Sequence, residues 1–181
     1  MKLDELLRVL DIVPDYAFLL TEEGDIIRFN RLVEEGLGYR RDDLSGSKAT
    51  KLHPPEFSED VIRTIGEILR GEKDICTLPL IGKSGEIIPA ETRISRIKLD
   101  GKDMLLALSR DISQRIEYEK RLDEKQEYLE RLISEWDTIF NSINDLISIH
   151  DKDFRIVRAN RALLEFLGMS EDEIRGKHCY E

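Results

Sequence analysis

The sequence predicts an α+β fold: one antiparallel sheet with helices packed across one face, then a long helix, then the start of a second copy. Three observations support this fold class. Short apolar runs joined by glycine-containing turns indicate β-hairpins. Residues 110–143 contain no glycine or proline and are rich in good helix formers, which indicates one long helix. The phrase at residues 26–46 recurs at residues 156–176, which indicates a repeated domain.

Residues 1–13 predict an amphipathic helix that Pro14 ends. Its apolar stripe consists of Leu3, Leu6, Leu7 and Leu10. The runs YAFLL and DIIRFN then predict two strands. They are joined by TEEG, whose Gly24 can adopt a positive φ, so we expect them to form a hairpin.

Helices follow this hairpin. Asn30 is in position to cap a short helix at RLVEEGL, which Gly38 ends, and RRDDLSG adds one more helical turn. The segment SEDVIRTIGEILRG predicts a longer helix with Ser58 as its cap and Gly71 as its stop. Its buried stripe is expected to consist of Val61, Ile62, Ile65, Ile68 and Leu69.

Three strand signals come next: DICTLPLIG, EIIPAETRIS and IKLDGKDMLLALS. The turn KSG joins the first two, and the third turns at Asp100-Gly101, a dipeptide typical of two-residue hairpins. Alternation places Cys76, Leu78 and Leu80 on one face of the first run, and Ala90, Thr92 and Ile94 on one face of the second.

The long helix carries a heptad pattern. Its a positions include Ile112, Glu119, Gln126, Ile133 and Phe140, and its d positions include Leu122, Leu129, Trp136 and Ile143. At 1.5 Å per residue, a helix of this length spans roughly 45 Å. The alternatives are a dimeric coiled coil or a solvated single helix, and the apolar d positions favour the coiled coil.

The repeat is gapless over residues 26–46 and 156–176. Identical pairs include Asn30 with Asn160 and Gly38 with Gly168, and the register extends upstream to Asp15 and Asp145. Since the second copy ends after roughly 40 residues, well short of a whole domain, we expect this chain to be a fragment of a longer protein.

Composition excludes several classes of partner. The net charge of −10 comes from 38 acidic and 28 basic residues that are interspersed, so neither nucleic acid nor an anionic membrane surface would attract the chain. No apolar run in this fragment is long enough to span a bilayer. Cys76 and Cys179 fit no zinc or redox spacing, and a reducing cytoplasm is the expected location.

Four segments follow one another along the chain: VPDYAFLLTEEGDIIRFNRLVEEGLGYRRDDLSGS, LHPPEF, LIGKSGEIIPAETRIS and LALSRDIS. In this order they resemble a PAS domain from start to end. RDIS resembles the family's terminal Asp-Ile-Thr signature, with Ser113 in place of the commoner Thr. The resemblance divides the chain into four parts: an N-terminal helix at 1–13, a PAS domain at 14–111, a signalling coiled-coil linker at 112–143, and the first part of a second PAS domain at 144–181. It implies a five-stranded antiparallel sheet.

The resemblance also implies a sensory, dimerising and non-catalytic module. Linkers of this kind join PAS domains to each other or to histidine kinases, so a histidine kinase is the expected output domain. A diguanylate cyclase or a transcription activator would fit equally well, and a ligand-free interaction scaffold is the rival from another class. No paired carboxylates or activated nucleophile support an enzyme within this chain.

The residues between the longest helix of the PAS domain and the sheet allow two interpretations. One is a ligand pocket, with the candidate lining Phe18, Phe29, Leu52, Ile62, Ile65, Leu78, Leu80, Ala90, Thr92 and Leu106. The other is that these residues fill a dry core, and the pattern favours it slightly because any sheet under a helix shows such a stripe. The identity of any small-molecule ligand stays open.

Haem and a photoreactive flavin are both disfavoured by the resemblance. Haem-binding relatives place a histidine on the long helix, and residues 59–70 contain none. Flavin photoreceptors need a cysteine within an Asn-Cys-Arg motif on the preceding helix, whereas Cys76 starts a strand and behaves as a small apolar residue.

His53 precedes a proline and is interpreted as a structural loop residue. His150 and His178 lack metal-site spacing.

Two groups of residues are predicted to transmit a signal and to form a homodimer. Asp111, Ile112 and Ser113 mark the change from strand to helix, where Asp111 can cap the helix and pair with Arg93, Arg96 or Arg115. Polar side chains at a positions, Glu119 and Gln126, can hold two packings near balance. The predicted dimer interface is Leu3, Leu7, Leu122, Leu129, Ile133, Trp136 and Phe140.

Overall fold

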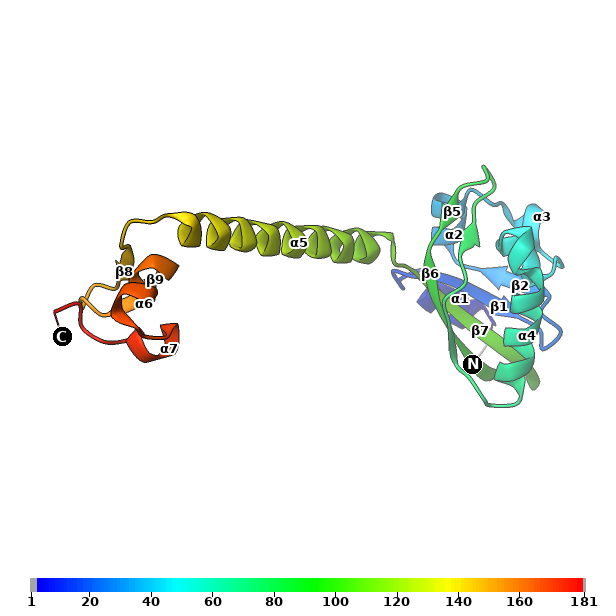
Figure 1. Cartoon of the computed structure of the whole chain (residues 1–181). Coiled ribbons are helices and arrows are strands. Elements are labelled where there is room, and N and C mark those ends of the chain that lie inside the picture. The colour runs from blue at the N-terminus through cyan, green and yellow to red at the C-terminus, as the bar shows by residue number, and fades with distance from the viewer. Residues whose placement is uncertain (1–2, 181) are drawn as a thin grey trace. The chain divides into compact units, whose positions relative to one another are not determined.

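The computed structural model describes residues 3–180, which form two compact units, one up to Tyr118 and one from Glu119 (Figure 1). The first unit has the predicted α+β architecture. Its elements in chain order are α1 (Leu3–Leu10), β1 (Tyr16–Leu20), β2 (Ile26–Phe29), α2 (Arg31–Leu37), α3 (Arg41–Leu44), η1 (Ala49–Leu52), η2 (Pro55–Phe57), α4 (Ser58–Leu69), β3 (Ile75–Cys76), β4 (Leu80–Ile81), β5 (Ile87–Ile88), β6 (Ala90–Leu99) and β7 (Lys102–Asp111).

The main sheet has five antiparallel strands in the order β2-β1-β7-β6-β3. The N-terminal strand β1 therefore lies beside the last strand, β7, near the middle of the sheet. Asp100 and Gly101 both have positive φ, which forms the predicted tight turn between β6 and β7. Strands β4 and β5 form a separate two-stranded ladder.

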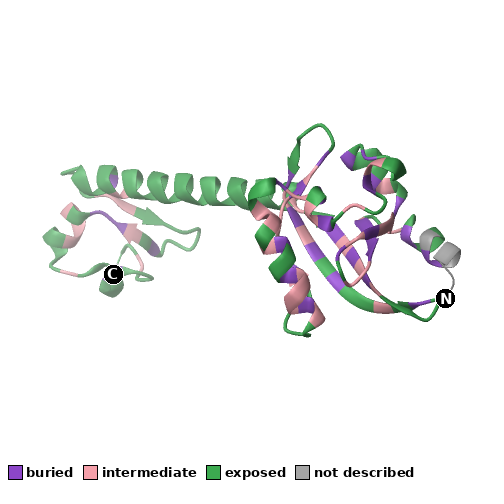
Figure 2. Cartoon of the chain, turned by 90° about the vertical axis from the view of Figure 1, so that its right-hand side faces the viewer, coloured by how far each residue is buried: buried purple, intermediate pink, exposed green. Residues whose placement is uncertain are grey.

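Alternating side chains on the sheet belong to two different hydrophobic clusters. On β1, Phe18 and Leu20 pack under the helices α2 and α4, whereas Ala17 and Leu19 pack against α1 on the opposite face. Buried and exposed residues accordingly alternate along β6 (Figure 2). Helices α2, α3 and α4 thus cover one face as predicted, and α1 covers part of the other.

Two of the predicted strands are interrupted at a proline. The run 74–82 forms strand only at β3 and β4, because Pro79 has no N–H for a ladder hydrogen bond. The run 86–95 is likewise divided at Pro89 into β5 and β6. The two prolines lie between the main sheet and the small ladder, so they mark where the chain passes from one to the other.

The buried stripe of α4 differs from the predicted one. Val61, Thr64 and Ile68 are buried, whereas Ile62 is 64% exposed and faces solvent. The prediction included Ile62 because it is apolar and passed over Thr64 because it is polar, although Thr64 lies one helical turn from Val61. The predicted cap Ser58 is instead the first residue of α4, and Phe57 is the N-cap.

The second unit begins within the long helix α5 (Ser113–Ser142). It continues with β8 (Ser148–His150), β9 (Ile156–Ala159), α6 (Arg161–Leu167) and α7 (Glu171–Ile174). This order repeats β1, β2, α2 and α3 of the first unit, as the sequence repeat predicts. Strands β8 and β9 pair antiparallel, and their register shifts near the end as it does between β1 and β2.

Replacing Leu105 by alanine should lower the free energy of unfolding of the first unit by about 2–5 kcal/mol, because its fully buried side chain leaves a cavity in the core. The matched control is Ile62→Ala on the exposed face of α4, which should change this free energy by about 0.5 kcal/mol or less. Urea denaturation followed by circular dichroism measures both variants. A large loss in the Ile62 variant would contradict the observed orientation of α4.

Candidate ligand cavity and helix junction

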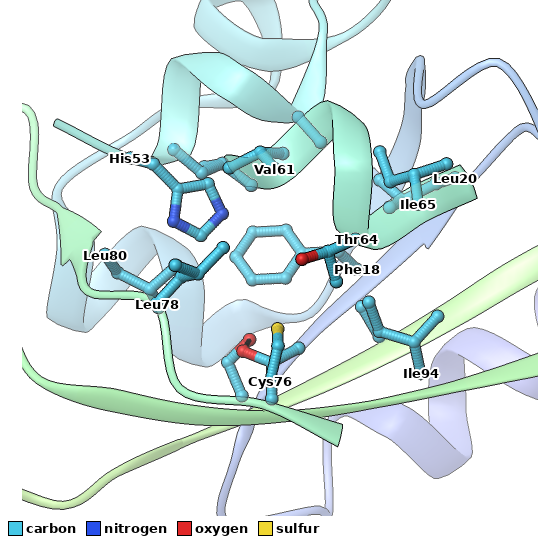
Figure 3. A pocket seen from close by; sticks show the side chains of 15 residues that line it. Phe18, Leu20, His53, Val61, Thr64, Ile65, Cys76, Leu78, Leu80 and Ile94 are labelled. Carbon is cyan, nitrogen blue, oxygen red and sulfur yellow. Dashed lines mark hydrogen bonds between the residues drawn. The ribbon is translucent and has the colours of Figure 1, made fainter. Parts of the chain in front are cut away.

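A cavity of about 40 Å³ lies between α4 and the sheet (Figure 3). Its walls come from β1, η1, α4, β3, β4, β6, β7 and the segments at His53 and Leu78. The lining consists of Phe18, Leu20, Ala49, Leu52, His53, Val61, Thr64, Ile65, Cys76, Leu78, Leu80, Thr92, Ile94, Ala107 and Ser109.

Six of the ten residues proposed from the sequence line this cavity: Phe18, Leu52, Ile65, Leu78, Leu80 and Thr92. The other four do not. Ile62 faces solvent, and Phe29 and Ala90 are buried in the core away from the cavity wall. Leu106 packs against the cluster on the opposite face of the sheet. Its neighbour Ala107 takes the cavity position, because successive strand residues point to opposite faces.

The wall formed by the sheet carries a row of small polar side chains. Cys76 pairs with Thr92, and Thr92 pairs with Ser109, on three adjacent strands. The hydroxyl oxygens of Thr92 and Ser109 lie 2.8 Å apart and share a hydrogen bond, which satisfies two buried groups. Burial raises the pKa of the Cys76 thiol, so the thiol is protonated and unreactive at neutral pH.

Thr64 supplies a polar group from the opposite wall. Its side chain is only 6% exposed, and its hydroxyl points into the cavity (Figure 3). A hydroxyl can both donate and accept, so a ligand or water with a polar atom could form a hydrogen bond with it at this wall. Sequence reasoning missed Thr64, although its spacing of three from Val61 placed it on the buried stripe.

His53 closes one end of the cavity. Its Nδ1 lies 2.7 Å from the carbonyl oxygen of Pro79, so in the neutral ring Nδ1 carries the proton and donates it. Burial lowers the pKa of His53, although the bond to Pro79 acts in the opposite direction. The ring is therefore neutral at pH 7, and its Nε2 is a hydrogen-bond acceptor at the cavity wall.

The lining of this cavity carries no ionised side chain. None of the fifteen lining residues is Asp, Glu, Lys or Arg, so no ionised group is present to pair with a charged ligand. The neutral His53 lies beside no activated nucleophile in the lining set. Among residues 3–180, no group of His, Cys, Asp and Glu side chains is arranged to hold a metal ion.

The junction between β7 and α5 is continuous and hydrogen-bonded. Ile112 alone separates the strand from the helix, and its N–H donates to the carbonyl of Pro89 at 3.0 Å. Its own carbonyl accepts from the N–H of Ile116 at 3.0 Å, the first turn of α5. The side chain of Asp111 accepts from the N–H of Ser113 at 2.8 Å, as a helix-start residue does.

Arg96, one of the arginines proposed as a partner of Asp111, is engaged elsewhere. It binds the carboxylate of Glu22 at 2.6 Å and the carbonyl of Leu69 at 3.1 Å. Strand pairing explains this, because Arg96 lies opposite Leu105, six residues along β7 from Asp111. Asp111 instead lies opposite Ala90 at the other end of the same strand pair.

The predicted dimer residues of α5 lie on the surface of the single chain, with one exception. Leu122, Leu129 and Ile133 are each more than half exposed, whereas Phe140 is 3% exposed. Trp136 stacks on Phe140 with 5.5 Å between the ring centroids. The polar a position Gln126 donates to Glu130 at 2.9 Å within the same helix. The side chains of Leu3 and Leu7 lie outside the described part of the structure.

Comparison with protein families matches residues 14–114 to a model described as a PAS domain, which is more than half of the chain. A second model, described as a PAS fold, matches residues 140–181. The chain belongs to the PAS domain family. The five-stranded sheet, with α2–α4 on one face and α5 leaving its last strand, is accordingly a PAS fold, and the second unit is the beginning of another.

Three curated relatives are sensors. The methyl sulfide methyltransferase-associated sensor of Methanosarcina acetivorans is 26% identical over 59% of this chain. The sensor histidine kinase TmoS of Ectopseudomonas mendocina is 24% identical over 82%, and the oxygen sensor protein DosP of Escherichia coli is 27% identical over 88%. The chain spans 11%, 16% and 19% of the length of these proteins, respectively.

Solved PAS domains share the fold. The PAS domain of a protein from Desulfitobacterium hafniense superimposes with a TM-score of 0.53 at 25% identity, covering 57% of this chain and 98% of that one. The PAS domain of an HTR-like protein from Haloarcula marismortui gives the same score and identity, covering 60% of this chain and 90% of that one.

None of the helices described between residues 3 and 180 has the length and apolar character needed to cross a bilayer.

The lowered pKa of His53 predicts a pH dependence of stability. Because the folded-state pKa lies below the usual value of about 6.5, the unfolded chain binds this proton more tightly. The stability that the neutral ring contributes is therefore complete above about pH 6.5 and decreases as the pH falls toward the folded-state pKa. His53→Asn keeps a donor for Pro79 but does not titrate, so this part of the decrease should disappear.

Urea denaturation of wild type and His53→Asn at several values between about pH 5 and pH 7.5 measures the difference. If both proteins lose the same free energy of unfolding over this range, the imidazole is not the titrating group.

Proposed function

We propose that this chain is the sensory and dimerisation region of a signal-transduction protein. A ligand or partner alters the packing around the cavity of the first PAS domain, and α5 carries the change toward an output domain. The chain's membership of the PAS family and its similarity to three sensors support a sensory role. The strand β7 supplies the route.

The observation that carries this proposal is the short path along β7 from the cavity to α5. Ser109 lines the cavity, Asp111 ends the strand two residues later, and Ser113 begins the helix after two more. On the partner strand β6, Thr92 lies opposite Ser109 and Ala90 lies opposite Asp111. The next residue, Pro89, accepts the hydrogen bond from the N–H of Ile112. A displacement of the Thr92–Ser109 pair therefore reaches both anchors of the helix start without crossing a flexible segment.

The cavity indicates what class of ligand would act. At about 40 Å³ it has room for about two or three water molecules and is far below the roughly 300–1,000 Å³ of a typical ligand pocket. A ligand larger than a few atoms must therefore displace partly buried side chains such as Leu78 and Ile65. A small, uncharged molecule with one polar end, directed at Thr64 or at the Thr92–Ser109 pair, fits the lining best. Haem and a photoreactive flavin stay disfavoured.

Dimerisation through α5 would bury its exposed apolar stripe. Leu122, Leu129 and Ile133 follow the a/d spacing of a coiled coil and have no cover in the single chain. The polar side chains of Glu119 and Gln126 at a positions would lower the stability of the pairing and keep two packings close in energy. A bias of a few kcal/mol at one end could then reset the populations of these packings.

The output domain is proposed from similarity alone. TmoS is a sensor histidine kinase, so a histidine kinase in a two-component system is the first expectation. The regulatory region of a diguanylate cyclase or of a transcription activator would use the same linker. We also propose a cytoplasmic location, because Cys76 and Cys179 fit no zinc or redox spacing and a reducing compartment suits them.

The small volume of the cavity favours one alternative, a ligand-free scaffold for protein–protein interaction. Native mass spectrometry of the purified dimer separates the two functions. A small molecule that copurifies with the chain supports sensing, and a mass equal to that of the bare dimer supports the scaffold.

Leu129→Glu should weaken the dimer by at least roughly tenfold, because a carboxylate at a d position would be buried against the partner helix. The matched control is Tyr128→Glu, a neighbour that is 51% exposed compared with 57% for Leu129 but lies at heptad position c. Sedimentation equilibrium measures both. Equal effects of the two substitutions would show that the heptad register is wrong.

Ala107→Val fills part of the cavity from β7 and should act as a bound ligand would. We expect the amide exchange rates of residues 112–118 to change severalfold, because these residues start α5. The control Leu106→Ile changes the adjacent residue on the opposite face of the same strand. Hydrogen exchange with mass spectrometry is the measurement, and identical protection of residues 112–118 in both variants would refute coupling along β7.

A further inference from the structure

One buried asparagine makes nearly the same set of hydrogen bonds in both units. Asn30 and Asn160 lie 130 positions apart and are 1% and 0% exposed. The Oδ1 of Asn30 accepts from the N–H of Ala17 at 3.1 Å, and that of Asn160 accepts from Ile147, also at 3.1 Å. In both units the Nδ2 donates to the carbonyl of an aspartate, Asp15 at 2.9 Å and Asp145 at 2.8 Å.

The second donor bond of each asparagine holds the end of the preceding helix. Asn30 Nδ2 donates at 3.0 Å to the carbonyl of Leu10, the last residue of α1. Asn160 Nδ2 donates at 3.0 Å to the carbonyl of Ile143, directly after α5. At the repeat spacing of 130, Leu10 corresponds to Phe140, so the carbonyl bound in the second unit, that of Ile143, lies three residues further along the chain. The reason is that α5 ends later in the repeat than α1 does. Carbonyls at a helix C-terminus have no partner within the helix. The carbonyl of Leu10 also accepts from the N–H of Val13 at 3.2 Å, so the bond from Asn30 is its second and ties the helix end to the loop before β1.

The residue that follows each asparagine adds a further hydrogen bond to the end of the preceding helix. The N–H of Arg31 donates to the side chain of Asp11 at 2.8 Å, and in the second unit the N–H of Arg161 donates to Asn141 at 2.9 Å. These two pairs again lie at the repeat spacing of 130. The residue that follows each asparagine is thus bonded to the residue at the end of the incoming helix.

Side-chain packing in the second unit extends the attachment up α5. Phe140 occupies the repeat position of Leu10, and both residues are 3% exposed. The guanidinium of Arg158 on β9 lies over the Phe140 ring, 5.4 Å from its centroid. Arg158 also forms an ion pair with Asp137 of α5 at 2.9 Å, at an angle outside that of a hydrogen bond. The last two turns of α5 therefore belong to the second PAS unit, as α1 belongs to the first.

We propose that Asn160 is the positioning residue through which the second PAS region holds α5 and receives its displacement, and that Asn30 holds α1 in the same way. This inference rests on the proposed sensory function only for its direction of transfer. The attachment itself follows from the hydrogen bonds. Both asparagines occupy the point where a helix end, a loop and the first strand of a sheet meet.

The test substitutes Asn160 by aspartate, which keeps the acceptor for Ile147 but removes both Nδ2 donors and places a carboxylate against two carbonyl oxygens. We expect amide exchange of residues 139–145 to rise at least tenfold at pH 7.5, and the emission of Trp136, the one tryptophan of the chain, to shift to the red. Exchange within α6 and α7 should stay unchanged. Uniformly faster exchange throughout the second unit would show a merely structural role and overturn the proposal.

Acidification should reverse the effect of Asn160→Asp on residues 139–145. A general destabilisation of the second unit would not be reversed in this way. Burial and the facing carbonyls raise the pKa of a carboxyl at position 160, whereas the N–H groups of Ile147 and Leu163 act in the opposite direction. Lowering the pH toward about 5 favours the protonated carboxyl, which can again donate one hydrogen bond. The Asn160→Asp protein should then regain most of its protection at residues 139–145, relative to wild type at the same pH. Absence of this recovery would contradict the proposal.

A milder variant covers the case in which Asn160→Asp does not fold. Asn141→Ala removes only the exposed bond to Arg161 and should raise exchange at residues 139–145 severalfold, and an unchanged rate there counts against the attachment. The proposed function is tested separately by Ala107→Val, read at residues 112–118. A negative result there refutes transfer along β7 and leaves the result at Asn160 standing.

Discussion

The two-residue turn at Asp100–Gly101 fixes the register of β6 and β7, and both candidate functional elements depend on that register. With both turn residues at positive φ, Thr92 must lie opposite Ser109, and Ile94 opposite Ala107. These pairs form the sheet wall of the cavity. The same register places Ala90 opposite Asp111, so the strand ends where Pro89 can accept a hydrogen bond from Ile112. A slip of one residue would move the hydroxyl pair to the other face.

Much of this arrangement could be predicted from the sequence, because local signals determine it. The hairpins, the positive φ at Gly24 and Gly38, the long helix and the repeat all depend on residues close in sequence or on the repeat itself. The cavity lining was harder to predict. Leu106 and Ala107 are both apolar, so strand parity alone distinguishes the residue that faces the cavity, and the Asp100-Gly101 turn fixes which residues lie opposite one another.

The remaining differences concern polar residues that serve tertiary contacts. Asn30 was predicted to cap α2, but its side chain makes no capping bond and instead joins Leu10, Asp15 and Ala17. Asn160 does both, since its Oδ1 also accepts from the N–H of Leu163. No local pattern distinguishes a capping asparagine from one that holds distant segments. Only its recurrence in both copies of the repeat could have indicated the wider role.

The position of β1 in the sheet has a consequence for biosynthesis. All five residues of β1 are buried, yet its neighbour β7 lies at the opposite end of the domain, with Tyr16 beside Ser109. A ribosome must therefore add on the order of 90 residues after β1 before that neighbour exists, which takes roughly 5 to 20 seconds. Throughout this interval the nascent chain carries an apolar strand with one open edge. Chaperones that bind such segments during translation should consequently matter more for this domain than its modest size suggests.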